Sequence, residues 1–413
     1  MARHEQFAGI DIGSTAIRIV VGQKRSSEDA LEIVAASEHP SEGISKGVIT
    51  SIEDATSSIS SALEKAERMS GSPIESAIVA LSGAQTMIHS SKGVAAIAKA
   101  SGEISEDDVM RATESAEAVA APPNYKLLHL IPKSFAVDGQ TGIKDPIGMT
   151  GTRLEVEAQV IHALSSHVEN MSKCVLRAGV DIQETVLGVL ACAEAVTTSR
   201  QKELGVAVVN IGAQTTSLAV FEEGDLLHSA VLPVGAGHFT NDIAIGLRIS
   251  IDLAEKVKLG YGTALPAGIS KHEEIDLSEF GPESTDRVSH RHVAEIIEAR
   301  LEEIFSMINK ELGKIHRMGL LPAGVVFSGG GSKLQGILEV AKKDLKLPAT
   351  LGSTALLTAI DKVNDPQFST AVGLILWNTK YLGGHASKRR FPGFSSVTNV
   401  ADKVRKWAKS LMP

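Results

Sequence analysis

The chain has 413 residues, of which 43% are hydrophobic and 22% are charged, and its formal net charge is −8 at pH 7. This length exceeds what one hydrophobic core usually supports, so we expect two or more domains, and the acidic balance argues against a protein that coats nucleic acid. The two cysteines, Cys174 and Cys192, are too few for a disulfide framework, and because no leader peptide or membrane-spanning apolar run is recognised, we expect a cytoplasmic protein.

The N-terminal part alternates strand and helix patterns. Residues 10–22 and 33–40 have the pattern of strands, and residues 75–83 are apolar enough for a buried strand. Between them, residues 51–70 carry apolar side chains at helical spacing. This alternation predicts mixed or parallel sheets covered by helices.

The stretch from 84 to 162 differs in character. It contains a helix start at 105–108 and a glycine-rich series of turns at 138–155. Helix and strand patterns resume after it, so we expect a separate unit inserted into the first domain.

A second α/β unit opens at Gly205. It contains a helical region around 285–318 and returns at 322–345 with a strand, three glycines and a helix. Residues 378–396 consist largely of glycine, serine and basic residues with little apolar surface to bury, which is typical of a linker.

Two segments share one pattern: AGIDIGSTAIRIVVG at 8–22 and VAVVNIGAQTTSLAVFEEG at 206–224. Each predicts a strand, a tight glycine corner and a second strand. Such a corner aims successive backbone N–H groups at one point, which suits phosphate oxygens, and a nearby carboxylate such as Asp11 suits Mg²⁺ or its waters. Hydroxyl donors are available from Ser14, Thr15, Thr215 and Thr216.

One glycine corner usually makes only a hairpin, but here there are two, together with SGGGSKL at 328–334, which we expect to end a strand and open a helix. Glycines at a helix N-terminus allow close approach of a nucleotide. Because the sequence contains no Walker loop, these features predict a nucleotide held between two related domains.

The same motifs, with GIKDPIGMTG at 142–151, resemble those of the FtsA family of bacterial cell-division proteins, a branch of the actin-like ATPases. The resemblance implies an α/β fold with two RNase H-like halves around a nucleotide cleft, an inserted α+β subdomain and a C-terminal amphipathic helix. It divides the chain into a first half at 1–83, 163–204 and 359–379, an insertion at 84–162, a second-half core at 205–241 and 311–358 with a small subdomain at 242–310, a linker at 380–396 and a terminal helix at 397–413.

The resemblance also implies that ATP and Mg²⁺ are bound, with Asp11 holding the metal through water. The implied nucleotide-binding residues are Asp11, Gly13, Ser14, Thr15, Arg18, Asn210, Gly212, Gln214, Thr215, Thr216, Gly235, Gly237, His238, Asp242, Glu255, Lys258, Gly329, Gly330, Gly331 and Ser332. Glu255 and Lys258, which would contact the adenosine, could instead form a surface ion pair.

Two departures from the family pattern affect hydrolysis. The second loop usually begins and ends with Asp, whereas this chain has Asn210 and Ser217 there. Hydrolysing relatives also place Glu or Gln before a Pro where this chain has Gly188 and Val189, and Glu194 lies six residues later. Since an attacking water must be positioned by such a side chain, we expect ATP binding with slow or absent hydrolysis.

The last residues predict an amphipathic helix that lies on a membrane. Its apolar face is Val397, Val400, Val404, Trp407 and Leu411, and its basic residues are Lys403, Arg405, Lys406 and Lys409. The helix is too short to span a bilayer but suits an anionic surface. The alternative is a helix docked on its own domain or on a partner.

The resemblance further implies filaments of the chain itself, capture of the C-terminal tail of the tubulin-like protein FtsZ, recruitment of other division proteins, and a site at the division plane on the inner face of the membrane. Arg300 falls on a basic position of the tail-binding helix, although it could equally be a solvated residue paired with Glu303. Two alternative functions are a PilM-like component of type IV pilus assembly and a sugar kinase of the same superfamily.

Overall fold

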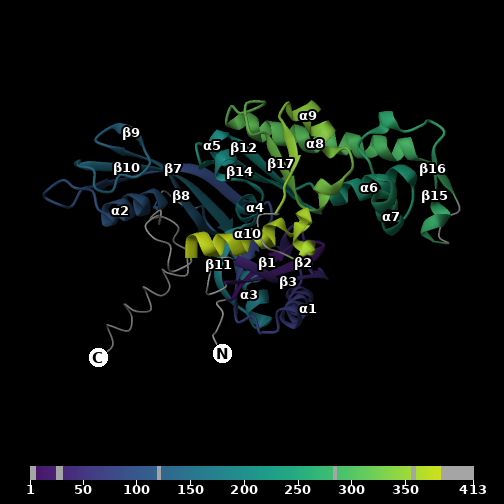
Figure 1. Ribbon diagram of the computed structural model, residues 1–413, viewed down its shortest axis with the longest axis horizontal. Coiled ribbons are helices and arrows are strands. Elements are labelled where there is room, and N and C mark those ends of the chain that lie inside the picture. Colours follow the sequence, from purple (N-terminus) through teal and green to yellow (C-terminus); the bar gives the residue numbers. More distant parts are fainter. Residues whose placement is uncertain (1–5, 25–30, 119–121, 282–285, 355–359, 383–413) are drawn as a thin grey trace.

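The computed structural model describes residues 6–24, 31–118, 122–281, 286–354 and 360–382 (Figure 1). The terminal helix predicted at 397–413, and all but the first three residues of the predicted linker, lie outside this part of the chain. Within the described residues, no helix is both long enough and apolar enough to cross a bilayer.

The first half is built on a five-stranded sheet with the order β11–β6–β1–β2–β3. Strands β1, β2 and β3 are antiparallel neighbours, whereas β6 pairs in parallel with β1, and β11 in parallel with β6. The strands are β1 (Gln6–Ile12), β2 (Ala16–Lys24), β3 (Leu31–Pro40), β6 (Ser76–Leu81) and β11 (Asp181–Leu187), and a small hairpin of β4 (Ile44–Ser45) and β5 (Val48–Ile49) follows β3.

The second half repeats this sheet. Its order is β14–β13–β12–β17–β18, again with three antiparallel strands followed by two parallel additions. The strands are β12 (Val206–Ile211), β13 (Thr216–Glu222), β14 (Asp225–Leu232), β17 (Val325–Ser328) and β18 (Ala349–Leu351). Because strand order and strand directions agree, the two glycine-cornered hairpins predicted from sequence occupy equivalent places in two related sheets.

Helices cover the outer faces of both sheets. On the first half these are α1 (Ile52–Ser70) and α3 (Ser165–Arg177), and on the second half α8 (His290–Lys314) and α9 (Ile337–Leu345). Helix α6 (Ala236–Leu247) packs on α8, and α7 (Ile251–Tyr261) packs on α6 at the end of the molecule near β15 (Glu274–Asp276) and β16 (Arg287–Ser289) (Figure 1). Helix α1 begins where the Ser51 hydroxyl accepts a hydrogen bond from Asp54 N, and it ends at Gly71, whose left-handed backbone closes the last turn. The short α5 (Ser199–Leu204) leads into β12, and β15 pairs with β16.

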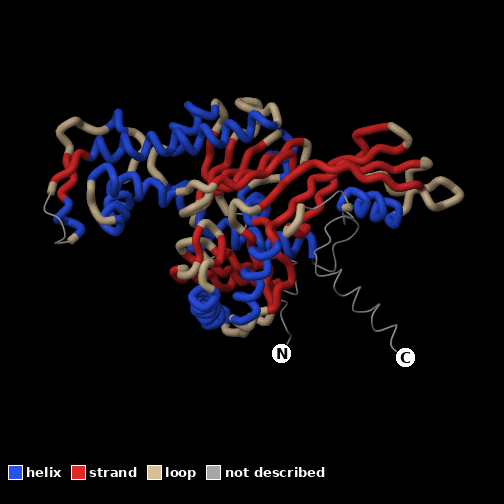
Figure 2. The backbone as a smooth tube through the Cα atoms, turned by 180° about the vertical axis from the view of Figure 1, so that it is seen from behind, coloured by secondary structure: helices blue, strands red, loops and turns tan. Residues whose placement is uncertain are grey.

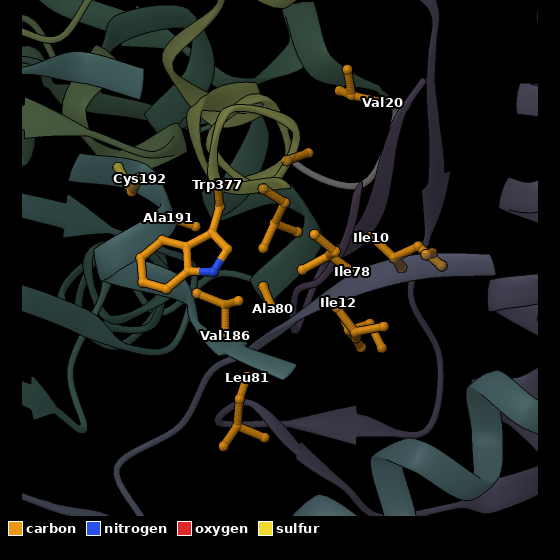
Figure 3. Close-up of a cluster of buried hydrophobic side chains, with 14 of the residues drawn as sticks. Ile10, Ile12, Val20, Ile78, Ala80, Leu81, Val186, Ala191, Cys192 and Trp377 are labelled. Carbon is orange, nitrogen blue, oxygen red and sulfur yellow. The ribbon is translucent and has the colours of Figure 1, made fainter. Parts of the chain in front are cut away.

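Two almost wholly buried helices, α4 (Gly188–Val196) and α10 (Ser369–Trp377), lie between the two sheets. Figure 3 shows apolar side chains of α4, α10, β1, β6 and β11 meeting in this core. The two helices approach closely at Gly373, where a Cβ would lie 1.8 Å from the Ala191 carbonyl oxygen, and α10 approaches β1 closely at Gly9, where a Cβ would lie 2.7 Å from the Ala371 carbonyl oxygen. One hydrophobic cluster therefore joins the inner faces of the two sheets, and a second cluster lies within the second half.

The segment between β6 and α3 forms a sheet of its own, with the order β7–β10–β8–β9, and packs helix α2 (Glu106–Glu117) onto it. The strands are β7 (Thr86–Ala96), β8 (Tyr125–Val137), β9 (Gln140–Ile143) and β10 (Arg153–Leu164). Figures 1 and 2 show this sheet extending outward beside β14, at the opposite end of the molecule from α7. Gln159 Nε2 donates to the Leu227 carbonyl across this contact, at 3.2 Å.

Candidate functional site

The site is built on the corners of the two equivalent hairpins. In the first, Asp11 lies opposite Arg18 in the register of the two strands, and Gly13 N donates to Ala16 O at 3.1 Å. In the second, Asn210 lies opposite Ser217 in the strand register, and the equivalent N–H, that of Gly212, donates to Thr215 O at 2.8 Å. The loops have the same length, so Asp11 and Asn210 occupy equivalent positions in the two halves.

The corners face each other across an inner cavity of about 70 Å³. Both hairpins line it, and the start of α10 and a turn of the β4–β5 hairpin complete its wall. The lining residues are Asp11, Ile12, Gly13, Ser14, Thr15, Arg18, Gly47, Ser82, Asn210, Gly212, Ala213, Gln214, Thr215, Ser217, Gly329, Gly330, Gln367 and Thr370.

A larger outer cavity of about 700 Å³ adjoins the inner one and shares with it Thr15, Arg18, Gly212, Ala213, Gly330 and Gln367. Its further walls come from α6, α7, the first residue of α8 and the segment after β17. The residues it adds are Ala236, Gly237, Phe239, Glu255, Lys258, Leu259, Gly260, Tyr261, Gly262, His290, Gly331, Lys333, Leu334 and Gln335. A small polar chamber thus opens into a larger cavity of mixed character.

Asp11 is the one carboxylate among the described residues that line the inner cavity. Burial raises the pKa of Asp11 from 3.8 to about 6, and the charge of Arg18 partly opposes this shift. The Arg18 guanidinium donates to Glu38 Oε1 at 2.7 Å and to Gln367 Oε1 at 2.9 Å, while its Nε is buried without a partner. A divalent cation beside Asp11 would favour the charged carboxylate.

Asn210 contributes no charge at the equivalent position. Its amide Nδ2 donates to the Thr370 hydroxyl at 3.0 Å, which joins the second sheet to the start of α10. Within the described residues, no group of three or more His, Cys, Asp or Glu side chains could hold a metal by itself.

The sequence left open whether Glu255 and Lys258 contact a nucleotide or form an ion pair with each other, and in the structure they are both paired and at the wall of a cavity. They form an ion pair with 2.6 Å between Lys258 Nζ and Glu255 Oε2, and the Thr240 hydroxyl joins both. The same two side chains line the outer cavity. The pair is thus preorganised at the cavity wall rather than free on the surface.

The glycines after β17 approach the second hairpin closely. Gly329 has a φ of +82°, and a Cβ there would lie 2.2 Å from Asn210 Oδ1. The prediction that this segment opens a helix was wrong, because residues 330–333 form a single 3₁₀ turn and α9 begins only at Ile337. The close backbone approach remains, but the α-helix dipole is not directed at the cavity from this segment.

Five predicted binding residues do not line either cavity: Thr216, Gly235, His238, Asp242 and Ser332. Thr216 and Ser332 are buried and donate to the Val234 and Gly329 carbonyls. His238 Nδ1 accepts from Gly235 N, so both of these residues serve the start of α6.

Asp242 is held instead by Arg300. The guanidinium donates to both carboxylate oxygens, with Nε–Oδ2 2.6 Å and Nη2–Oδ1 2.9 Å, and it also pairs with Glu303. The sequence had assigned Asp242 to the nucleotide and Arg300 to a protein partner, but the structure joins them in one ion pair between α6 and α8.

Sequence reasoning missed four polar or glycine positions of the inner cavity: Gly47, Ser82, Gln367 and Thr370. They come from a turn, the end of a strand and the start of a helix, and none has a motif of its own. In the outer cavity it missed Tyr261 and His290. The rings of these two residues make an edge contact, and His290 Nε2 forms a hydrogen bond with the Tyr261 backbone oxygen at 2.9 Å.

The positions that bear on hydrolysis lie as follows. A Cβ on Gly188 would lie 3.2 Å from the Ser82 hydroxyl, so this position borders the inner cavity without offering a side chain to it. Glu194 lines neither cavity, because it binds Lys202 at 2.8 Å and Lys380 at 3.0 Å. Positive charge from these lysines keeps the pKa of Glu194 below its ordinary value although burial opposes this.

Comparison with known proteins places this geometry in a family. The sequence model described as "Cell division protein FtsA" matches residues 207–373, and that described as "SHS2 domain inserted in FTSA" matches residues 83–162. The cell division protein FtsA of Pseudomonas aeruginosa is 34% identical over 410 residues, which cover 98% of each chain.

Solved structures agree on the fold. A chain of the PilM–PilN type IV pilus biogenesis complex superposes with a TM-score of 0.65 at 18% identity, covering 91% of this chain and 98% of that one. MreB5 of Spiroplasma citri bound to ADP gives 0.52 at 14% identity, covering 91% and 96%. The sequence match extends over the whole length, whereas these likenesses show the fold alone. The chain therefore belongs to the FtsA family of cell-division proteins, with the actin-like fold and its inserted SHS2 domain.

Proposed function

We propose that this chain binds ATP with Mg²⁺ in the cleft between its halves and polymerises on the inner face of the cytoplasmic membrane. There it would tether FtsZ filaments at the division site and recruit later division proteins. The observation that carries nucleotide binding is the pair of equivalent glycine corners that face one cavity from two halves. The likeness to MreB5, whose structure holds ADP, supports the same site.

The residues present fit a magnesium nucleotide. Corner N–H groups other than those of Gly13 and Gly212, together with the hydroxyls of Ser14 and Thr15, would bind phosphate oxygens at the inner cavity. The buried carboxylate of Asp11 would hold Mg²⁺ through water, and the metal would neutralise phosphate charge. The outer cavity, with Glu255 and Lys258 on its wall, has room for the nucleoside.

Hydrolysis would be slow or absent. Asn210 supplies no charge where the first hairpin has Asp11, and Gly188 offers no side chain to position water beside the inner cavity. Glu194 is engaged by two lysines. Steady phosphate release of several per minute from assembled protein, abolished by Asp11→Ala, would contradict this proposal.

Nucleotide binding is tested by calorimetric titration of the full chain with Mg-ATP. We expect saturable binding that weakens strongly in Asp11→Ala and only slightly in Asp361→Ala, an exposed position distant in sequence from the hairpins. Absence of heat from wild-type protein at millimolar ATP would refute the site.

Membrane attachment is assigned to the terminal amphipathic sequence that contains Trp407, which lies outside the described residues. A single helix of this type binds weakly, so polymerisation would add avidity by bringing many copies to one surface. Sedimentation with anionic liposomes, with and without ATP, should pellet the full chain and leave a chain ending at Gly384 in solution. Equal pelleting of both chains would refute the assignment.

Capture of the FtsZ tail is assigned to α8 around Arg300. Because the guanidinium already binds Asp242 and Glu303, an acidic tail would have to share or replace these carboxylates. Binding of a labelled FtsZ C-terminal peptide should weaken in Arg300→Glu. Unchanged affinity in this charge-reversal variant would remove Arg300 from the site.

A further inference from the structure

The side chain of Gln214 crosses the inner cavity from one half of the molecule to the other. Gln214 occupies the position in the second corner that Thr15 occupies in the first, since both follow the corner glycine by two residues. Its Oε1 accepts hydrogen bonds from the Ser45 hydroxyl, at 3.2 Å, and from the backbone N–H of Lys46. These acceptor contacts join the second half to the β4–β5 turn of the first half.

The β4–β5 turn is itself fixed to the first half. Lys46 and Gly47 both have positive φ, +50° and +74°, as a two-residue hairpin turn of this kind requires. Gly47 N donates to the Ser14 hydroxyl at 2.9 Å, and Gly47 O bonds His167 Nε2 at 2.8 Å. A Cβ on Gly47 would lie 2.8 Å from Gly83 N. Because the turn is tightly packed, a bond to it holds the half itself rather than a loose loop.

Adjacent amides of this turn therefore bind opposite hairpins. The N–H of Lys46 is bound by Gln214 of the second corner, and the N–H of Gly47 by Ser14 of the first. Of these side chains, only Gln214 spans the two halves. Gly47, Ser14 and Gln214 all line the inner cavity, so this bridge forms part of the wall that would surround bound phosphates.

We propose that Gln214 is a latch that joins the two halves across the inner cavity and thereby sets the rate at which nucleotide leaves. The inference rests on the proposed nucleotide site and adds its regulation. The inner cavity of about 70 Å³ is enclosed on the side of the turn by this bridge. A phosphate chain seated between the corners leaves as the halves separate, and separation requires the bonds from Gln214 to break.

The size of the effect follows from the bonds that are lost. Removing the two hydrogen bonds accepted by Gln214 should speed nucleotide release about tenfold, because each such bond has a modest net strength. Gln214→Met is the suitable change, since it keeps the length of the side chain and removes the acceptor. Gln214→Glu keeps an acceptor oxygen and is the conservative rescue for the bond to the turn.

Hydrogen exchange tests the latch without any nucleotide. In Gln214→Met we expect the Lys46 amide to exchange faster and the Gly47 amide to stay protected, whereas in Ser14→Ala the Gly47 amide should respond and Lys46 should not. Gln214→Glu should restore protection of Lys46. If the Lys46 amide exchanges equally in wild type and Gln214→Met, the proposal is overturned.

Nucleotide release is then measured with a fluorescent ADP analogue chased by unlabelled ATP. A tenfold faster release of the analogue in Gln214→Met supports the latch. If release is unchanged although the Lys46 amide exchanges faster, Gln214 does not control nucleotide release and the proposal is overturned. If wild-type protein binds no nucleotide while Lys46 still responds to Gln214→Met, the proposed nucleotide function fails and the bridge between the halves stands.

Discussion

The buried carboxylate of Asp11 should make the nucleotide-free protein less stable than a variant with an amide at this position. Its pKa rises from 3.8 to about 6 because burial disfavours the charged form, and Arg18 offsets this only in part. One pKa unit corresponds to about 1.4 kcal/mol, so keeping Asp11 ionised above pH 7 costs the folded state about 3 kcal/mol. Asp11→Asn, which gives the first hairpin the residue type found at Asn210, should recover most of this free energy.

The pH dependence has a definite sign. For an acid whose folded pKa is raised, the penalty is absent at low pH, develops between 3.8 and about 6, and is constant above that range. Asp11→Asn should therefore unfold about 3–4 °C higher than wild type at pH 7.5, and the difference should nearly vanish at pH 4. A bound cation would mask the effect, so thermal unfolding is measured with a chelator and without nucleotide.

The control is Asp361→Asn, at an exposed position, which should change the midpoint little at either pH. The same Asp11→Asn protein should also lose its stabilisation by Mg-ATP, so that the more stable apo protein is the weaker binder. A gain in midpoint of equal size at pH 4 and pH 7.5 would show that ionisation of Asp11 is not its cause.

Three further predictions concern the framework of the site. Gly373→Ala should destabilise the chain by about 3 kcal/mol, because its Cβ would meet a backbone oxygen of α4. The control is Gly268→Ala, where a Cβ meets nothing within 4 Å, and equal thermal midpoints of the two variants would contradict the packing argument. A double-mutant cycle of Asp242→Ala and Arg300→Ala should give a coupling energy of about 1 kcal/mol in unfolding experiments, whereas additive effects would deny the ion pair between α6 and α8. Burial raises the pKa of Glu184, which lies beside the Trp377 indole, from 4.5 to about 7, so its ionisation at high pH costs the folded state free energy. Glu184→Gln should therefore raise the thermal midpoint at pH 8 and leave it unchanged at pH 4.5. A rise only at the lower pH would reverse the expected sign.

Local patterns predicted the elements that carry the site. Alternating apolar residues and a corner glycine specify each hairpin, and their repetition in one chain predicted two related domains; the structure shows that these hairpins belong to two sheets of the same strand order. The helix expected at 51–70 is α1, which its serine cap and helical spacing define. The helix expected around 285–318 is α8, His290–Lys314, so the pattern identified the element but placed its ends a few residues too far out.

Features that depend on tertiary packing were not accessible to this reasoning. Gly47 and Thr370 reach the inner cavity only because a short hairpin and a buried helix pack against the first sheet, and neither residue lies in a recognisable motif. Asp242 and Arg300 are 58 positions apart, so their ion pair becomes visible only when α6 and α8 are placed together. The prediction that SGGGSKL at 328–334 opens a helix was wrong because a single 3₁₀ turn follows the strand there.

The contact between α4 and α10 bears on how this molecule can move. At Gly373 the backbones of the two helices approach so closely that lengthwise sliding would drive side-chain atoms of one helix into the carbonyl groups of the other. A small swing of one helix about this contact point requires no such collision. We therefore expect the cleft to open as a hinge rather than by shear, with the axis through the glycine contact and the largest displacement at the rims farthest from it.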